Sequence, residues 1–107
     1  FRSVRDYCVS HAILFTELNQ EQNADMLITK NGREAAIIIY SKQSGMRQFK
    51  ISKKVPTYIV FIDEETKEQF VRNLDLSFTQ ASNVLKMAIQ YGYVKLVSIE
   101  NLDQIVL

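Results

Sequence analysis

The sequence is poor in the residues that build redox, metal and membrane sites. It has one cysteine and one histidine, Cys8 and His11, so no intrachain disulfide can form. A zinc site needs several such ligands, and none occur here at ligand spacing. No apolar run approaches the roughly 20 residues that span a bilayer, and no signal peptide is evident. The three glycines, at positions 32, 45 and 92, suit turns or a helix cap, so there is no glycine-rich phosphate loop. We expect no metal, no cofactor and no membrane partner, and a cytoplasmic protein.

Charge is nearly balanced overall but is distributed unevenly along the chain. The 107 residues include 13 Lys and Arg and 12 Asp and Glu. Residues 1–62 have a net charge of +4 and residues 63–107 a net charge of −3. No acid occurs between positions 35 and 62, where every charged side chain is Lys or Arg. This asymmetry favours an anionic partner.

The first half of the sequence predicts a helix followed by a hairpin. Apolar side chains at steps of three and four predict an amphipathic helix over residues 4–18. Strands over residues 25–30 and 33–42 flank Asn31 and Gly32, a favoured pair in tight hairpins because both turn positions take positive φ. Residues 35–40 are apolar on both faces, which is typical of a strand inside a sheet.

The second half predicts further strands and a helical crossover. Residues 47–52 alternate as a half-exposed strand does, and residues 58–62 form a buried-type strand after Pro56. Helices over residues 64–73 and 78–91 precede a strand at residues 94–99. Ser77 and Gln80 have the spacing of a capping box, and Gly92 suits a C-cap.

These elements predict an α+β fold. We expect an N-terminal helix, a mixed sheet of about five strands with a central hairpin, a two-helix crossover and a C-terminal strand. The chain has 107 residues, the length of one domain, so we expect residues 1–107 to form a single α+β domain. Because the chain starts at Phe1 and stops in an apolar stretch, we expect a fragment of a larger protein.

The predicted order of elements resembles the restriction-endonuclease-like fold, which is shared by DNA-cutting and junction-resolving enzymes. In that family an Asp opens the second core strand, and an acid lies two positions before a Lys on the next strand. The carboxylates hold Mg²⁺ and the Lys positions or activates water. The resemblance places Asp25 at the Asp position and Lys42 at the Lys position, so an active enzyme would use these two residues.

This chain departs from the family pattern at the second carboxylate. The residue two before Lys42 is Tyr40. A tyrosine is neutral at pH 7, since its reference pKa is about 10, and it cannot replace a carboxylate on a hard cation. We therefore expect no catalytic and no metal-binding residue, and a degenerate nuclease-like domain rather than an active enzyme.

A basic ribbon, defined as residues 42–54, follows the hairpin. Its cations and its aromatic side chain are the candidate nucleic-acid-binding residues: Lys42, Arg47, Phe49, Lys50, Lys53 and Lys54. Cations and an aromatic on a half-exposed strand can follow a nucleic-acid backbone. The alternative is an edge strand whose lysines protect it from aggregation.

Two other patterns have structural explanations. The helices over residues 64–73 and 78–91 and the following strand could form a winged helix that enters the major groove. Lys86 is the only cation of the second helix, and residues 63–107 are net negative, so we expect a helix pair covering a sheet. Cys8 and His11 lie on the apolar stripe of the first helix, and we expect both to be packed rather than to form a nucleophile–base pair.

The sequence thus favours a non-catalytic binding or architectural domain that contacts nucleic acid through the basic ribbon. A protein–protein interaction module is the alternative, with the C-terminal strand pairing with the remainder of the parent chain. A metal-dependent nuclease is the third hypothesis.

Overall fold

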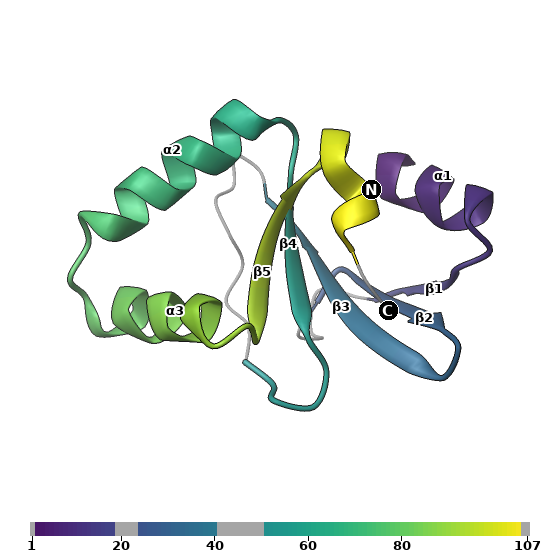
Figure 1. Cartoon of the computed structure of the whole chain (residues 1–107), viewed down its shortest axis with the longest axis horizontal. Helices are drawn as coiled ribbons and strands as arrows, with labels where there is room; N and C mark the ends of the chain where they lie inside the picture. The colour runs from purple at the N-terminus through teal and green to yellow at the C-terminus, as the bar shows by residue number, and fades with distance from the viewer. Residues whose placement is uncertain (1, 19–23, 41–50, 106–107) are drawn as a thin grey trace.

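The described helices and strands between residues 26 and 98 follow the predicted order, whereas a strand at residues 14–17 and a 3-10 helix at residues 99–104 were not predicted. The computed structural model describes residues 2–18, 24–40 and 51–105. Its elements are α1 (Arg2–Ser10), β1 (Leu14–Glu17), β2 (Met26–Lys30), β3 (Arg33–Ile39), β4 (Thr57–Phe61), α2 (Glu64–Asp75), α3 (Gln80–Gln90), β5 (Val94–Ser98) and the 3-10 helix η1 (Ile99–Gln104). The predicted α+β class is confirmed (Figure 1).

The five strands in the described part of the chain form one mixed sheet in the order β1-β2-β3-β4-β5. The first three strands pair antiparallel, whereas β3, β4 and β5 run parallel. The step from β4 to β5 passes through α2 and α3, which confirms the two-helix crossover. We call the side of the sheet where β3, β4 and β5 end the carboxyl edge, and the side where they begin the amino edge.

The predicted hairpin between β2 and β3 is confirmed. Lys30 pairs with Arg33, so only Asn31 and Gly32 lie between the paired residues. Both turn residues take positive φ, 54° at Asn31 and 78° at Gly32. This is the backbone geometry that the Asn-Gly pair supplies at low cost, and its twist matches that of the flanking strands.

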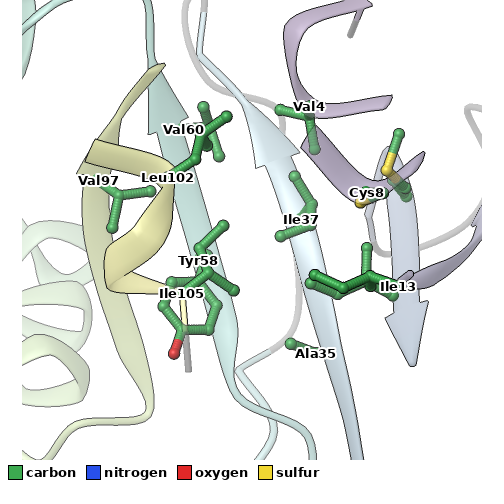
Figure 2. Close-up of a cluster of buried hydrophobic side chains, with 12 residues drawn as sticks. Val4, Cys8, Ile13, Ala35, Ile37, Tyr58, Val60, Val97, Leu102 and Ile105 are labelled. Carbon is green, nitrogen blue, oxygen red and sulfur yellow. The ribbon is translucent and has the colours of Figure 1, made fainter. Parts of the chain in front are cut away.

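Helical elements cover both faces of the sheet (Figure 1). On one face α1 and η1 lie over a core of mainly aliphatic side chains, part of which is drawn in Figure 2: Val4, Cys8, Ile13, Ala35, Ile37, Tyr58, Val60, Val97, Leu102 and Ile105. On the other face α2 and α3 cover a second core: Ala24, Ile38, Ile59, Phe61, Leu85, Ala88 and Val94. All five residues of β4 are buried because this strand contributes to both cores.

The predicted first helix is wrong beyond Ser10. Ala12 takes a φ of 55°, and the Ile13 amide donates to the Cys8 carbonyl (2.9 Å), which closes the end of α1. The chain then pairs with β2 as strand β1, so sheet hydrogen bonds outweigh the helical spacing of the apolar residues. Leu14, which the pattern placed on the buried stripe, is 74% exposed.

Both crossover helices begin at a side-chain cap, and the cap of the second helix is not the predicted residue. The Asp63 side chain accepts from the Thr66 amide (2.7 Å) at the start of α2. The cap of α3 is Thr79, which accepts from the Ser82 amide (3.1 Å), so the predicted capping box at Ser77 is wrong. Gly92, with a φ of 81°, follows α3 as predicted. Because β5 lies parallel to β4 in the main sheet, the helix pair covers a sheet and no winged helix forms.

The predicted strand over residues 47–52 falls largely outside the described residues. Ile51 and Ser52, which are described, belong to no strand. In the described sheet, β1 and β5 are the edge strands. None of the helices in the described ranges has the length and apolar character needed to cross a membrane.

Candidate functional site

Acidic and basic side chains separate along the direction of the parallel strands. Asp25 precedes β2 at the carboxyl edge, and Asp63 and Glu64 follow β4 there. Glu100 and Asp103 belong to η1, directly after β5. At the opposite, amino edge, Lys53 and Lys54 precede β4 and are exposed. These acids therefore lie at the edge opposite Lys53 and Lys54, although Glu34, at the start of β3, is exposed near the amino edge.

Asp25, the carboxylate assigned by the nuclease-like resemblance, forms a hydrogen bond with the backbone. Its Oδ2 accepts from the Ile39 amide at 2.8 Å. Its own amide donates to the Ile37 carbonyl (2.9 Å), and its carbonyl accepts from the Leu18 amide (3.0 Å). Asp25 thus connects the end of β1 with the end of β3 at the carboxyl edge.

Tyr40, which the resemblance places where that family has its second acid, belongs to an aromatic cluster. Its ring centroid lies 4.9 Å from that of Phe61 and 5.4 Å from that of Phe70. The rings of Phe61 and Phe70 are 5.2 Å apart. Tilted and edge-on ring contacts at these separations stabilise a core. Tyr40 therefore packs between the sheet and α2.

Candidate metal ligands are not grouped around Asp25 and Tyr40 in the part of the chain that the structure describes. Mg²⁺ prefers several oxygen ligands, at least one of them a carboxylate. Within residues 2–18, 24–40 and 51–105, no group of three or more His, Cys, Asp or Glu is arranged to hold a metal ion. Lys42, the other residue of the resemblance, lies outside the described residues.

Glu64 is the centre of a polar cluster that sequence reasoning missed, and we call it the Glu64 clasp. Oε1 accepts from Ser98 Oγ (2.7 Å) and from Asn101 Nδ2, and Oε2 lies 2.9 Å from Lys67 Nζ. The hydrogen bond from Lys67 is the largest cause of a lowered pKa at Glu64, and the bond from Ser98 is the next. The clasp joins the first turn of α2 to the junction of β5 and η1.

The basic ribbon is described only at its end. Lys53 and Lys54 are exposed, and the amides of Lys54 and Val55 donate to Ser52 Oγ at 3.1 and 3.2 Å. This turn leads into Pro56 and β4 and holds both lysines at the amino edge. The remaining predicted contacts lie outside the described residues: Lys42, Arg47, Phe49 and Lys50.

Two tyrosines lie beside these lysines, and the sequence prediction did not include them. The Tyr93 carbonyl accepts from the Thr57 amide (3.0 Å), which places Tyr93 next to the start of β4. Lys53 Nζ is 6.0 Å from the centroid of the Tyr93 ring. The Tyr91 ring lies 6.2 Å from the Tyr93 ring, and Tyr91 as a whole is 62% exposed. We call Lys53, Lys54, Tyr91 and Tyr93 the amino-edge cluster.

The structure also revises the division of charge into two halves of the chain. Residues 76–99, like residues 35–62, contain no Asp or Glu. These two acid-free segments contain α3 and β5, and most of β3 and all of β4, which are neighbours in the fold. The acids of the C-terminal part lie in and around α2 and in η1. Helix α3 contains no Asp or Glu, so its own sequence gives no reason to assign it to an acidic surface.

Cys8 and His11 have different environments. Cys8 is buried in the core, as predicted, and burial raises the pKa of its thiol. The predicted packing of His11 is wrong, because the residue is exposed after the end of α1 and its ring stacks on Tyr7 at 4.0 Å. A buried thiol with a raised pKa lacks the thiolate character and the access that a nucleophile needs.

Comparisons with known proteins add no relative to this picture. No family model matches the chain, and no curated protein or solved structure matches it either. The arrangement of its own side chains is therefore the basis on which function is argued.

Proposed function

We propose that this chain is a non-catalytic binding domain that contacts nucleic acid through the amino edge of its sheet. The separation of charge along the parallel strands is the observation that supports this most. Phosphate neutralisation by Lys and Arg supplies most non-specific affinity for nucleic acid. Lys53 and Lys54 are exposed at the amino edge, whereas Asp63, Glu64 and Glu100 lie beyond the opposite ends of the strands. A polyanion would therefore approach the amino edge.

The proposal includes the resemblance to the nuclease-like fold but not the metal-dependent cleavage that the family carries out. Asp25 accepts a backbone hydrogen bond and Tyr40 contributes to an aromatic core. Both residues therefore support the fold, although the resemblance assigns them to the family's metal-binding positions. We infer a degenerate nuclease-like domain that retains contact with nucleic acid.

The binding proposal is tested by the salt dependence of affinity. Wild-type protein and a Lys53→Ala/Lys54→Ala variant are titrated against duplex DNA at several salt concentrations. Weak, sequence-independent binding is expected, and the double variant should reduce the slope of log K against log salt by up to about two units. Arg72→Ala, an exposed cation on α2, is the control and should leave affinity nearly unchanged. Absence of binding to duplex and single-stranded DNA alike at low salt, or an equal effect of Arg72→Ala, would contradict the proposal.

The absence of catalysis is tested separately. We expect no Mg²⁺- or Mn²⁺-dependent cleavage of single- or double-stranded DNA by the wild-type chain, because no carboxylate stands at position 40. Cleavage that disappears in Asp25→Ala would restore the third hypothesis, a metal-dependent nuclease.

A protein–protein interaction module is the second candidate, and one surface favours it. Val84 and Met87 on α3 and Tyr91 at its C-cap recur at steps of three and four, and each is at least half exposed. Phe78 and Leu76, before α3, are 81% and 77% exposed. Contiguous apolar side chains at a surface often mark an interface. Concentration-dependent sedimentation that Met87→Glu removes would support this candidate.

A further inference from the structure

Charge alone does not indicate which form of nucleic acid the amino edge would take. Duplexes and single strands both present phosphates, but only an unpaired strand offers the flat faces of its bases. The aromatic side chains of the amino-edge cluster therefore carry information that its lysines do not. Tyr91 and Tyr93 lie where the acid-free segments over residues 35–62 and 76–99 meet.

We propose that Tyr91 and Tyr93, together with Lys53 and Lys54, form a stacking platform for single-stranded nucleic acid. This inference rests on the proposed function and specifies its ligand. Tyr91 is 62% exposed, so a base has access to this residue. Aromatic rings beside cations are the combination that binds single strands with little dependence on sequence, since every base has a π face.

The backbone holds the two tyrosines in place before any ligand arrives. The Tyr91 amide donates to the Met87 carbonyl and the Tyr93 amide donates to the Ala88 carbonyl, each at 2.9 Å. Gly92 between them takes a φ of 81°, which turns the chain from α3 toward β5. A platform fixed in this way loses little conformational freedom when a base stacks on it.

The charges around the cluster suit an anionic backbone. Lys53 Nζ lies 6.0 Å from the Tyr93 ring centroid, and Lys54 is the next residue. Neither α3 nor β4 nor β5 carries an acid. Glu34, near the start of β3, is exposed close to the same edge, but Arg33 is its neighbour and Lys30 lies across the hairpin. The backbone phosphates therefore meet lysines next to the rings.

The experiment uses the full chain and fluorescein-labelled oligothymidylate, with a duplex of mixed sequence as the second probe. The variants are Tyr91→Ala, Tyr91→Phe, Lys53→Ala and, as a matched control, Phe78→Ala. Phe78 is an exposed aromatic residue before the other end of α3. Circular dichroism verifies that each variant is folded. Fluorescence anisotropy then gives affinity and its salt slope for each probe.

We expect Tyr91→Ala to weaken binding of the single strand by about 5- to 100-fold, the usual range for the loss of one stacked base. Its salt slope and its duplex affinity should remain those of wild type, because no phosphate contact is removed. Tyr91→Phe should restore most of the affinity, and Phe78→Ala should have no effect. Lys53→Ala should instead lower the single-strand salt slope by about 0.7.

The outcomes separate the inference from the proposal on which it rests. Binding to both probes with no effect of Tyr91→Ala would overturn the stacking platform but leave the proposed function intact. An equal loss from Phe78→Ala would also overturn it. Absence of binding to either probe at low salt would overturn both, and the exposed face of α3 would then be the surface to pursue.

Discussion

Asp25 and Glu64 each accept hydrogen bonds from groups that lie far along the chain. The Ile39 amide is 14 residues from Asp25, and Ser98 and Asn101 are 34 and 37 residues from Glu64. The sequence drew attention to Asp25 as a metal-ligand candidate but not to Glu64. A residue's type and its local spacing do not show which later strand supplies its partner, so these roles could not be predicted.

Replacing Asp25 should therefore affect folding. In Asp25→Ala the Ile39 amide loses its acceptor, and an unsatisfied part-buried donor costs about 1–3 kcal/mol. We expect the free energy of unfolding, measured by urea denaturation, to fall by this amount. Asp6→Ala, at an exposed position of α1, should change it little. Equal stability of the wild type and Asp25→Ala would show that the hydrogen bond contributes nothing.

The Glu64 clasp should make the stability of the fold depend on pH in the acidic range. The folded-state pKa of Glu64 lies below its ordinary value of 4.5. The clasp therefore makes its full contribution to the free energy of unfolding above pH 4.5. The contribution is lost as pH falls through the folded pKa. The melting temperature of Glu64→Gln should therefore be lower than that of wild type near neutral pH, with a smaller difference in acid. Glu68→Gln, in an exposed pair with Arg72, should show a small difference at every pH.

At the scale of elements, the hairpin and the crossover could be predicted, whereas the end of α1 could not. Asn31 and Gly32 specify their turn by themselves, because few residue pairs accept two positive φ values. The end of α1 depends on Ala12, a residue that gives no stop signal and yet takes a φ of 55°. Pairing of β1 with β2 imposes this conformation. The spacing of apolar residues by three and four does not reveal that pairing.

Ala12→Gly should therefore stabilise the protein. A left-handed conformation costs a non-glycine residue roughly 1–2 kcal/mol, and glycine avoids this cost. The greater freedom of glycine in the unfolded chain removes part of the gain. We expect a net increase of up to about 1 kcal/mol in the free energy of unfolding. Ser10→Gly, at the last residue of α1 and without a positive φ, is the matched control and should give no such gain. A loss of stability in Ala12→Gly would mean that the chain does not turn at this residue.

At the scale of the whole molecule, burial patterns predicted the core better than charge patterns predicted the surface. The apolar strands β3 and β4 are central, as their sequences indicate. The division into a basic and an acidic half was misleading, because β5 and α3 return to the neighbourhood of β4. The association of Tyr93 with Lys53 depends on this return, so no local pattern could reveal the amino-edge cluster.

The core beneath α1 and η1 should be sensitive to its C-terminal contribution. Leu102 is 6% exposed and packs with residues from α1 and the sheet (Figure 2). Leu102→Ala should lower the free energy of unfolding by about 2–5 kcal/mol, as other large-to-small core substitutions do. Leu76→Ala, at a position 77% exposed, is the matched control and should have little effect. Similar denaturation midpoints for the two variants would contradict this account of the core.

The strand order β1-β2-β3-β4-β5 has a consequence for how the chain is made. Among the described strands, each pairs with the one before it in the sequence, so the sheet can grow by addition at one side while the ribosome is still translating. The layer that α1 and η1 form over one face of the sheet cannot be completed in the same way. Its residues Leu102 and Ile105 leave the ribosome after the five described strands. During synthesis, the N-terminal helix must therefore rest on an open apolar face until the last segment arrives.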